Sequence, residues 1–363
     1  MKAVLTEEKL QKLVLLRKQL HENAEIAHQE YRTKALLESF LERETDFEIV
    51  KQDGWFYAVK YGTNAEDVVA FRAEMDALPI TEDGKPVSHR CGHDGHMAAV
   101  CGTALALKEI TPARTVCLVF QPAEEVGEGG DLCARTLTEE LPVREIYACH
   151  NRSGYPEGSV ICREGLTQPS SEGIILSFTG KTSHASEPEK GRNPAGAICE
   201  LALTAAGMNR ESPMILSTVT GIRVGSGDFG LSPGEGELRI TLRAENERDM
   251  KMQESRLLQK AEELAGQDGL ALETAVRDYF PETRNHEACA EKVISSAERL
   301  GLTVIRPEDF WRASEDFGYY TKEFPGAMFY MGNGTDYPAL HTTGYEFQDR
   351  ILGTITKMFL ELI

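Results

Sequence analysis

The runs VVAF at residues 68–71, GHMAAVCGTALALK at 95–108 and TVCLVF at 115–120 decide the fold class. The first and third runs are short and apolar, which favours buried strands, and the second has the length and spacing of a helix. The run EIYA at 145–148 indicates another buried strand. This alternation predicts a largely parallel α/β sheet with helices on its faces. In such sheets, functional groups collect beyond the carboxyl ends of the strands.

The middle of the chain has a different pattern. It predicts strands at residues 173–179, 235–243 and 271–276, and helices at 194–208 and 249–265. We interpret this block as strand-helix-strand-strand-helix-strand, the order of a small ferredoxin-like α+β layer.

The α/β pattern returns after Asn285, with a helix expected at 288–300, a strand at 326–331 and a terminal helix after Gly344. The middle block is therefore interpreted as an insertion into a split catalytic domain. The expected domains are the first part of the catalytic domain at residues 1–168, the inserted domain at 169–280 and the second part of the catalytic domain at 281–363.

The composition is acidic, with 58 Asp and Glu against 39 Lys and Arg and a formal net charge of -19. No run of basic residues interrupts this balance, so we expect neither a nucleic-acid nor a membrane partner. Residues 1–20 are typical of an amphipathic surface helix, and no stretch approaches the ~20 apolar residues that span a bilayer. Eight cysteines are scattered singly, without the spacing of a disulfide framework, so a reducing, cytoplasmic location is expected.

The segment CGHDGH at residues 91–96 contains four side chains that can bind or orient a metal. In an extended stretch, Cys91 and His93 are two residues apart and point to the same side. A thiolate and an imidazole that face one cavity suit zinc or another borderline divalent ion. The alternative is a loop before a helix whose histidines bond the backbone, but the clustering favours a metal site.

Two neighbouring carboxylates, Glu124 and Glu125, follow the strand expected at 115–120. Adjacent residues at a strand end diverge, so one carboxylate can hold a metal while the other moves protons to and from water. The alternative is a solvated surface pair, because two adjacent glutamates are weak evidence by themselves.

His150 closes the strand at 145–149, and His341 lies in a loop near the carboxyl end. A lone histidine is more often structural, but these two with Cys91, His93 and a glutamate would supply five ligands. A tetrahedral ion needs three or four ligands, so five suggest two ions that share a bridging ligand. Spacing alone assigns no function to the further histidine in the inserted domain, His184.

Taken in order, the motifs resemble those of the amidohydrolase and aminoacylase branch of the M20 metallopeptidases, which includes hippurate hydrolases and indole-acetyl-amino-acid hydrolases. The similarity runs nearly from end to end. The motifs are RAEMDALP at 72–79, CGHDGH at 91–96, QPAEE at 121–125, His150, GKTSHA at 180–185, SEDF at 314–317, PG at 325–326 and LH at 340–341.

The resemblance implies a split α/β catalytic domain with two divalent ions and an inserted lid that commonly mediates homodimerisation. It implies that Cys91 is a bridging thiolate and Glu124 the general base and acid. It further implies that His184 reaches the partner subunit's active site and supports the oxyanion, and that Arg243 contacts the substrate carboxylate. The remaining implied metal ligands are His93, Glu125, His150 and His341.

The sequence departs from the family pattern at three places. Gly230 stands where the family has the asparagine of an Asn-Val-Ile-Pro stretch, Glu74 replaces the more usual aspartate, and Ala24 replaces a common proline. The first change removes an amide that can bond substrate, so the family's substrate specificity does not transfer with the fold. None of the expected metal ligands is altered.

These features together predict a two-metal hydrolase that cleaves the amide bond of N-acyl amino acids or similar small conjugates with a metal-activated water. Mixed cysteine, histidine and glutamate ligation suits zinc or manganese, and admits cobalt or nickel. The alternatives are a dipeptidase of the same fold, a binding or regulatory relative that has lost turnover, and a redox function for Cys91. The intact Glu124 and complete ligand set favour the enzyme.

Overall fold

The computed structural model describes residues 4–363, which form two compact units. Unit 1 comprises residues 4–167, Thr283–Phe310 and Glu315–Ile363, and unit 2 comprises Gln168–Glu282 and Trp311–Ser314. The short segment at 311–314 lies outside the inserted domain expected at 169–280. Within unit 2, Arg243 Nη1 donates a hydrogen bond to Ser314 Oγ of this segment over 2.6 Å.

Unit 1 is built on an eight-stranded sheet with the order β1-β2-β4-β3-β5-β16-β6-β15. The four central strands all run parallel: β4 (Arg114–Gln121), β3 (Asn64–Glu74), β5 (Val143–Arg152) and β16 (Gly326–Gly332). The outer strands are β1 (Glu48–Lys51), β2 (Phe56–Lys60), β6 (Val160–Ile161) and β15 (Val304–Ile305). A separate short pair joins β7 (Gly165–Gln168) to β14 (Thr283–Asn285).

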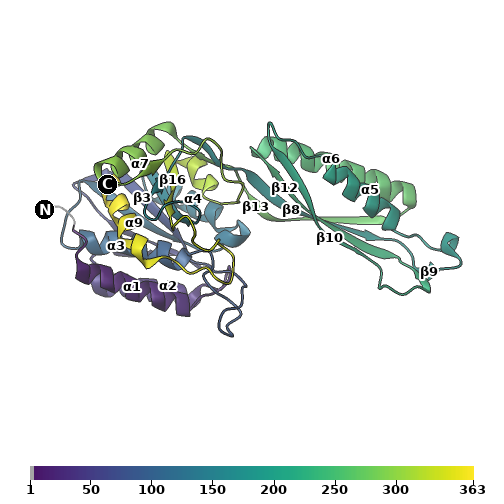
Figure 1. The fold of residues 1–363 in the computed structure, drawn as a ribbon, viewed down its shortest axis with the longest axis horizontal. Coiled ribbons are helices and arrows are strands. Elements are labelled where there is room, and N and C mark those ends of the chain that lie inside the picture. Colours follow the sequence, from purple (N-terminus) through teal and green to yellow (C-terminus); the bar gives the residue numbers. More distant parts are fainter. Residues whose placement is uncertain (1–3) are drawn as a thin grey trace. The chain divides into compact units, whose positions relative to one another are not determined.

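Helix α3 (His93–Leu107) is buried along its whole length, which its small and apolar residues permit. It packs against β3 and is covered by α1 (Glu7–Glu22), α2 (Tyr31–Glu44) and α9 (Asp349–Leu362) (Figure 1). The other helices of unit 1 are the 3-10 turn η1 (Glu124–Val126), α4 (Gly129–Glu140), α7 (Glu287–Arg299) and α8 (Gly318–Glu323).

Unit 2 has a four-stranded antiparallel sheet with the order β10-β12-β8-β13, and both long helices lie on one face of it (Figure 1). Alternate residues such as Leu238, Ile240 and Leu242 are buried beneath the helices. The elements in chain order are β8 (Ser170–Thr179), β9 (Ser183–His184), η2 (Pro188–Lys190), α5 (Ala195–Ala206), β10 (Ile215–Val224), β11 (Leu231–Ser232), β12 (Glu235–Ala244), α6 (Glu247–Asp268) and β13 (Ala271–Phe280).

The predicted fold class, a split domain with a mostly parallel sheet and an inserted ferredoxin-like layer, is confirmed. The sequence did not locate β10, because this strand is half exposed and its register shifts at Thr220, between Val219 and Gly221. Several boundaries also differ. Near the site, α3 begins at His93 instead of Gly95, and β5 continues through His150 to Arg152. Among the described residues, no helix is long and apolar enough to cross a membrane.

Candidate metal centre

Six of the eight predicted site residues gather at one edge of the unit 1 sheet. Because β3, β4, β5 and β16 are parallel, their carboxyl ends meet at this edge. Each strand contributes its own final residues or the loop that follows. The six residues are Cys91, His93, Glu124, Glu125, His150 and His341.

Cys91 and His93 come together by a different geometry from the extended stretch that we expected. Gly92 has φ 100° and ψ 14°, a left-handed conformation, and α3 begins at the next residue. A Cβ atom at position 92 would lie 2.1 Å from Asn151 Oδ1, so only glycine fits. A tight turn at Gly92 therefore brings the thiol and the imidazole into one cluster. The two side chains do not share one side of an extended strand, as we had expected.

The Cys91 sulfur lies between two imidazole rings. Its Sγ atom is 3.3 Å from His150 Nε2 and 3.3 Å from His341 Nε2. The His150 Nδ1 donates to the Asn151 carbonyl over 2.7 Å, so in the neutral ring the Nε2 lone pair faces the sulfur. This pairing of an Nδ1–H with a backbone carbonyl is the usual way in which a ligand histidine is oriented.

His93 and the two glutamates form the other side of the cluster. His93 Nδ1 donates to the Asp76 carbonyl over 2.8 Å, and its Nε2 lies 3.8 Å from Glu124 and 3.7 Å from Glu125. Among the described residues, neither His93 Nε2 nor Glu125 Oε1 has a hydrogen-bond partner, although both atoms are buried. Buried polar atoms without partners are rare, and an ion placed between them would satisfy both.

These two buried atoms without partners indicate that the cluster fits divalent metal ions. Thiolate, imidazole and carboxylate ligands suit borderline ions such as zinc. Burial, followed by the nearby carboxylates, raises the pKa of the Cys91 thiol well above its usual value, and burial raises the pKa of Glu125 to about 7. A cation would reverse both effects, because it favours the charged forms of its ligands.

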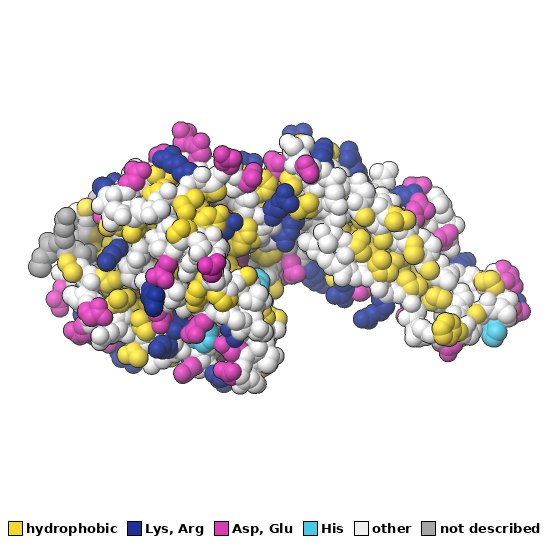
Figure 2. Space-filling view, viewed as in Figure 1, with side chains coloured by type: hydrophobic (Ala, Val, Ile, Leu, Met, Phe, Trp, Pro, Cys, Tyr) yellow, Lys and Arg dark blue, Asp and Glu magenta, His cyan; other side chains and the backbone are white. Residues whose placement is uncertain are grey.

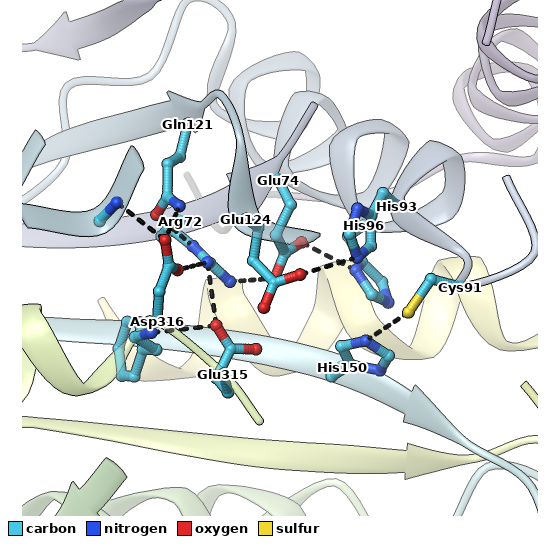
Figure 3. Close-up of polar contacts among 12 residues, drawn as sticks. Arg72, Glu74, Cys91, His93, His96, Gln121, Glu124, His150, Glu315 and Asp316 are labelled. Carbon is cyan, nitrogen blue, oxygen red and sulfur yellow. Dashed lines mark hydrogen bonds and ion pairs between the residues drawn. The ribbon is translucent and has the colours of Figure 1, made fainter. Parts of the chain in front are cut away.

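A network of buried charged residues lies beside Glu124, on the side opposite the histidines (Figure 3). Arg72 pairs with Glu74, with Asp316 at 2.5 Å and with Glu315 at 2.9 Å. Burial, then Glu315 and Glu125, raises the pKa of Glu124 well above the ordinary range. A carboxyl group in this state holds a proton tightly.

The segments 72–79 and 314–317 were recognised in the sequence as motifs, but no function was predicted for their residues. In the structure, Glu74 accepts from His96 Nδ1 over 2.9 Å, and Glu315 lies with Glu124 and Asp316 in one group of buried acids. The sequence does contain a signal, because Arg72, Glu74 and Asp76 alternate after the buried run VVAF and so lie on one face of the strand. In a parallel sheet covered by helices on both faces, such charged residues must find partners.

The other two predicted residues, His184 and Arg243, belong to unit 2. His184 is exposed on β9, and its Nδ1 accepts from the Ser186 backbone N–H over 3.1 Å and lies 2.7 Å from Ser186 Oγ. Because the backbone N–H can only donate, the neutral ring carries its proton on Nε2. Burial lowers the pKa of Arg243, whose guanidinium donates to Ser314.

Gly230, the departure noted in the sequence, lies beside His184. Its carbonyl accepts from Ala185 N–H over 2.9 Å, and β11 pairs with β9 directly after it. A Cβ atom at position 230 would meet only Asp228 Oδ1, at 3.2 Å. Glycine in place of asparagine therefore removes an amide group from the surface, while the backbone pairing around position 230 is kept.

Comparison with known proteins identifies the class. Residues 70–363 match peptidase family M20/M25/M40. The chain is 29% identical to an N-acetylcysteine deacetylase of Bacillus subtilis (strain 168), over 97% of this chain and 96% of that protein. It is 27% identical to an N-acetyldiaminopimelate deacetylase of Priestia megaterium, over 95% of this chain and 97% of that protein. A Bacillus subtilis structure described as a dinuclear metal-binding M20 peptidase has 25% identity and a TM-score of 0.80, and 98% of each chain is covered.

The chain belongs to peptidase family M20/M25/M40. It is a metal-dependent hydrolase of amide or peptide bonds, as the sequence predicted.

Proposed function

We propose that this protein is a two-metal hydrolase that cleaves the amide bond of N-acyl amino acids or similar small amide conjugates. The observation that carries the proposal is the buried cluster around Cys91, in which His93 Nε2 and Glu125 Oε1 lack hydrogen-bond partners among the described residues. The solved relative described as dinuclear supports the number of ions.

Five residues would hold the two ions: Cys91, His93, Glu125, His150 and His341. The central place of the Cys91 sulfur between two imidazoles supports its assignment as the ligand shared by both ions. When bound, divalent ions of this kind would polarise the scissile carbonyl and lower the pKa of water at the site. Zinc and manganese are the proposed ions.

Glu124 is proposed as the general base and acid. It lies in the cluster beside His93 and is 6% exposed, so it faces the reacting centre with little bulk water around it. It would take a proton from the attacking water and deliver it to the departing amine.

His184 and Arg243 are proposed to contact the substrate. The hydrogen bond from Ser186 N–H to Nδ1 leaves His184 with an Nε2–H donor, which suits an oxyanion. The half-buried Arg243 guanidinium suits a substrate carboxylate, which it can bind with two parallel hydrogen bonds. The names of the two deacetylase relatives support acylated amino acids as the substrate class.

A homodimer through unit 2 is also proposed. Helix α5 exposes an apolar stripe in which Leu203 is 76% exposed, and Figure 2 shows hydrophobic side chains gathered over α5 and β10. The stripe continues through Gly196, Cys199 and Ala206. Strand β10 lies at the edge of the sheet. Its first residues bond Asn209 and Arg210, and the rest of its outer side can bond another strand. A second copy packed on this face would cover both features.

We retain the cytoplasm as the proposed location. Within the described residues all eight cysteines are free thiols, and seven of them are buried. This use of cysteine is typical of a reducing compartment.

Amine release tests the proposal directly. The protein is purified without chelator and incubated with N-acetyl, N-benzoyl and indole-acetyl amino acids and with dipeptides, with added manganese or zinc or with EDTA. We expect metal-dependent cleavage of at least one N-acyl amino acid and its loss in EDTA. Preferential cleavage of dipeptides would indicate the dipeptidase alternative. No release from folded, metal-loaded protein would contradict the proposal.

A further inference from the structure

Glu124 and Glu125, which follow β4, are proposed to act as general base and metal ligand, so their side chains must point in different directions. The backbone that sets these directions is strained at the residue before them. Ala123 has φ 54° and ψ 38°, in the left-handed region that non-glycine residues rarely adopt. The turn η1, which carries Glu124 and Glu125, begins at the next residue. The direction of both side chains therefore depends on this one left-handed residue.

A side chain from a distant part of the chain holds this residue. Glu30 Oε1 accepts the Ala123 backbone N–H over 2.8 Å, although 93 positions separate the two residues. Glu30 is 3% exposed and Ala123 is fully buried. A carboxyl oxygen accepts a hydrogen bond whether or not the group is ionised, and burial removes the competition from water.

The Glu30 side chain does not cap helix α2. Glu30 occupies the residue before the helix, but its side chain makes no capping hydrogen bond there. Glu25 Oε2 caps the helix instead, because it accepts the backbone N–H groups of Arg32 and Thr33 over 2.8 and 2.9 Å. Of the backbone groups that act on the Glu30 carboxyl group, Ala123 N–H has the largest effect on its pKa, ahead of the nearby backbone of Glu30 and His28.

A second carboxylate holds the other end of the same short segment. Asp76 Oδ2 accepts the Glu125 backbone N–H over 2.8 Å, and the Asp76 carbonyl accepts from His93. The loop before Glu30 is in turn tied to the residue after Asp76, since Ala77 N–H donates to the Glu25 carbonyl over 2.8 Å. The segment 123–125 is therefore clamped at both ends.

We propose that Glu30 is a positioning residue for the reaction, which acts by holding Ala123 in its left-handed conformation so that Glu124 and Glu125 point to their separate tasks. This inference rests on the proposed function of those two glutamates. Without the Glu30 carboxylate, Ala123 would relax towards a more favourable backbone conformation and η1 would rotate away from the cluster.

Three variants test the clamp. Glu30→Ala removes the acceptor, Glu30→Gln keeps a side-chain oxygen at the same reach, and Glu30→Asp keeps the charge but is one methylene too short. For each we would measure kcat, KM and the zinc affinity by competition with a chromophoric chelator. We expect kcat and zinc affinity of Glu30→Ala to fall roughly 10- to 100-fold, the usual range for residues that orient metal ligands. KM should change little, Glu30→Asp should lose nearly as much, and Glu30→Gln should stay within about threefold of wild type because its oxygen still accepts.

Ala123→Gly supplies the decisive control. Glycine adopts the left-handed conformation without the penalty that alanine carries, so it needs the clamp less. In the Glu30→Ala background we expect Ala123→Gly to recover about tenfold of the lost kcat and zinc affinity, the equivalent of the ~1 to 2 kcal/mol left-handed penalty. A general loss of packing at position 30 would not be repaired by removing a methyl group from position 123.

Several results would overturn the inference. One is a folded Glu30→Ala protein with wild-type kcat and zinc affinity. Another is a double variant no better than Glu30→Ala. Should Glu30→Ala fail to fold, the comparison of Glu30→Asp with and without Ala123→Gly decides in the same way. If wild type cleaves no N-acyl amino acid but Glu30→Ala still loses zinc affinity, the proposed function fails and the clamp stands.

Discussion

The two units present their proposed functional residues in opposite ways. In unit 1 most of the groups are buried, although His341 is exposed and Glu125 is half-buried. They come from four strand ends and constrain one another, as Cys91 does between His150 and His341. In unit 2, His184 is exposed at a short strand and is oriented by a single neighbour, Ser186. The departure Gly230 lies in this second, open setting.

This difference indicates how the two units divide the chemistry. A buried, mutually constrained cluster fixes the reaction type, because any change in one group leaves another without a partner. An exposed residue with few contacts can change without disturbing the fold, which suits substrate selection and assembly. Substitutions in unit 1 should therefore affect turnover and metal binding. Those in unit 2 should leave metal binding intact and affect substrates and association, and at His184 also turnover, because this residue is proposed to support the oxyanion.

The largest expected effect is that of Glu124→Gln. The amide cannot take up the proton of the attacking water, so kcat should fall by ~10² to 10⁴-fold, while zinc content and KM stay close to wild type. Steady-state kinetics and metal analysis of the same preparation check this. Full activity in Glu124→Gln would refute the assignment of the base, and loss of metal would make the residue a ligand.

The next effect concerns association through unit 2. Leu203→Glu places a charge within the apolar face that the proposed dimer would bury, and should raise the dissociation constant ~100-fold or more. Light scattering after size exclusion should then show a monomer that still binds zinc. Leu132→Glu on α4, where the leucine is 51% exposed in unit 1, is the matched control and should leave the dimer intact. Monomeric wild-type protein, or a dimer that survives Leu203→Glu, would contradict this surface.

The smallest effect is a pH dependence of stability at Glu30. Burial, with Asp76 as a second cause, raises the pKa of Glu30 to about 7. The folded state therefore holds a proton that the unfolded state releases, so wild type loses stability as pH rises from about 4.5 to 7, and Glu30→Gln does not. Urea unfolding should show Glu30→Gln gaining about 1 to 3 kcal/mol relative to wild type between pH 4.5 and 8. A constant difference across this range would show that Glu30 is ionised throughout.

The sequence predicted the sheet and the inserted layer because their signals are local. Runs such as VVAF at 68–71 contain no polar residue and must therefore be buried, and the order of the motifs restricts the fold further. It also brought six site residues to one edge, since the carboxyl ends of parallel strands meet there. Strand β10 was missed because edge strands need no continuous apolar run.

The parts that could not be predicted depend on contacts between distant segments. No local pattern indicates that Glu30 bonds Ala123, or that Arg72 gathers three acids. The left-handed turn at Gly92 was likewise invisible, since the glycine alone does not tell which neighbour approaches it. Such contacts appear only once the fold has brought the segments together.

Titration of metal-free protein with zinc or manganese counts the ions that each chain binds. We expect wild type to bind two ions per chain and Cys91→Ala to weaken the binding of both, because the sulfur is proposed to be shared. Calorimetry or competition with a chromophoric chelator would give the stoichiometry and the affinities. One ion or none in wild type, or two ions bound with unchanged affinity in Cys91→Ala, would contradict the proposed two-metal centre.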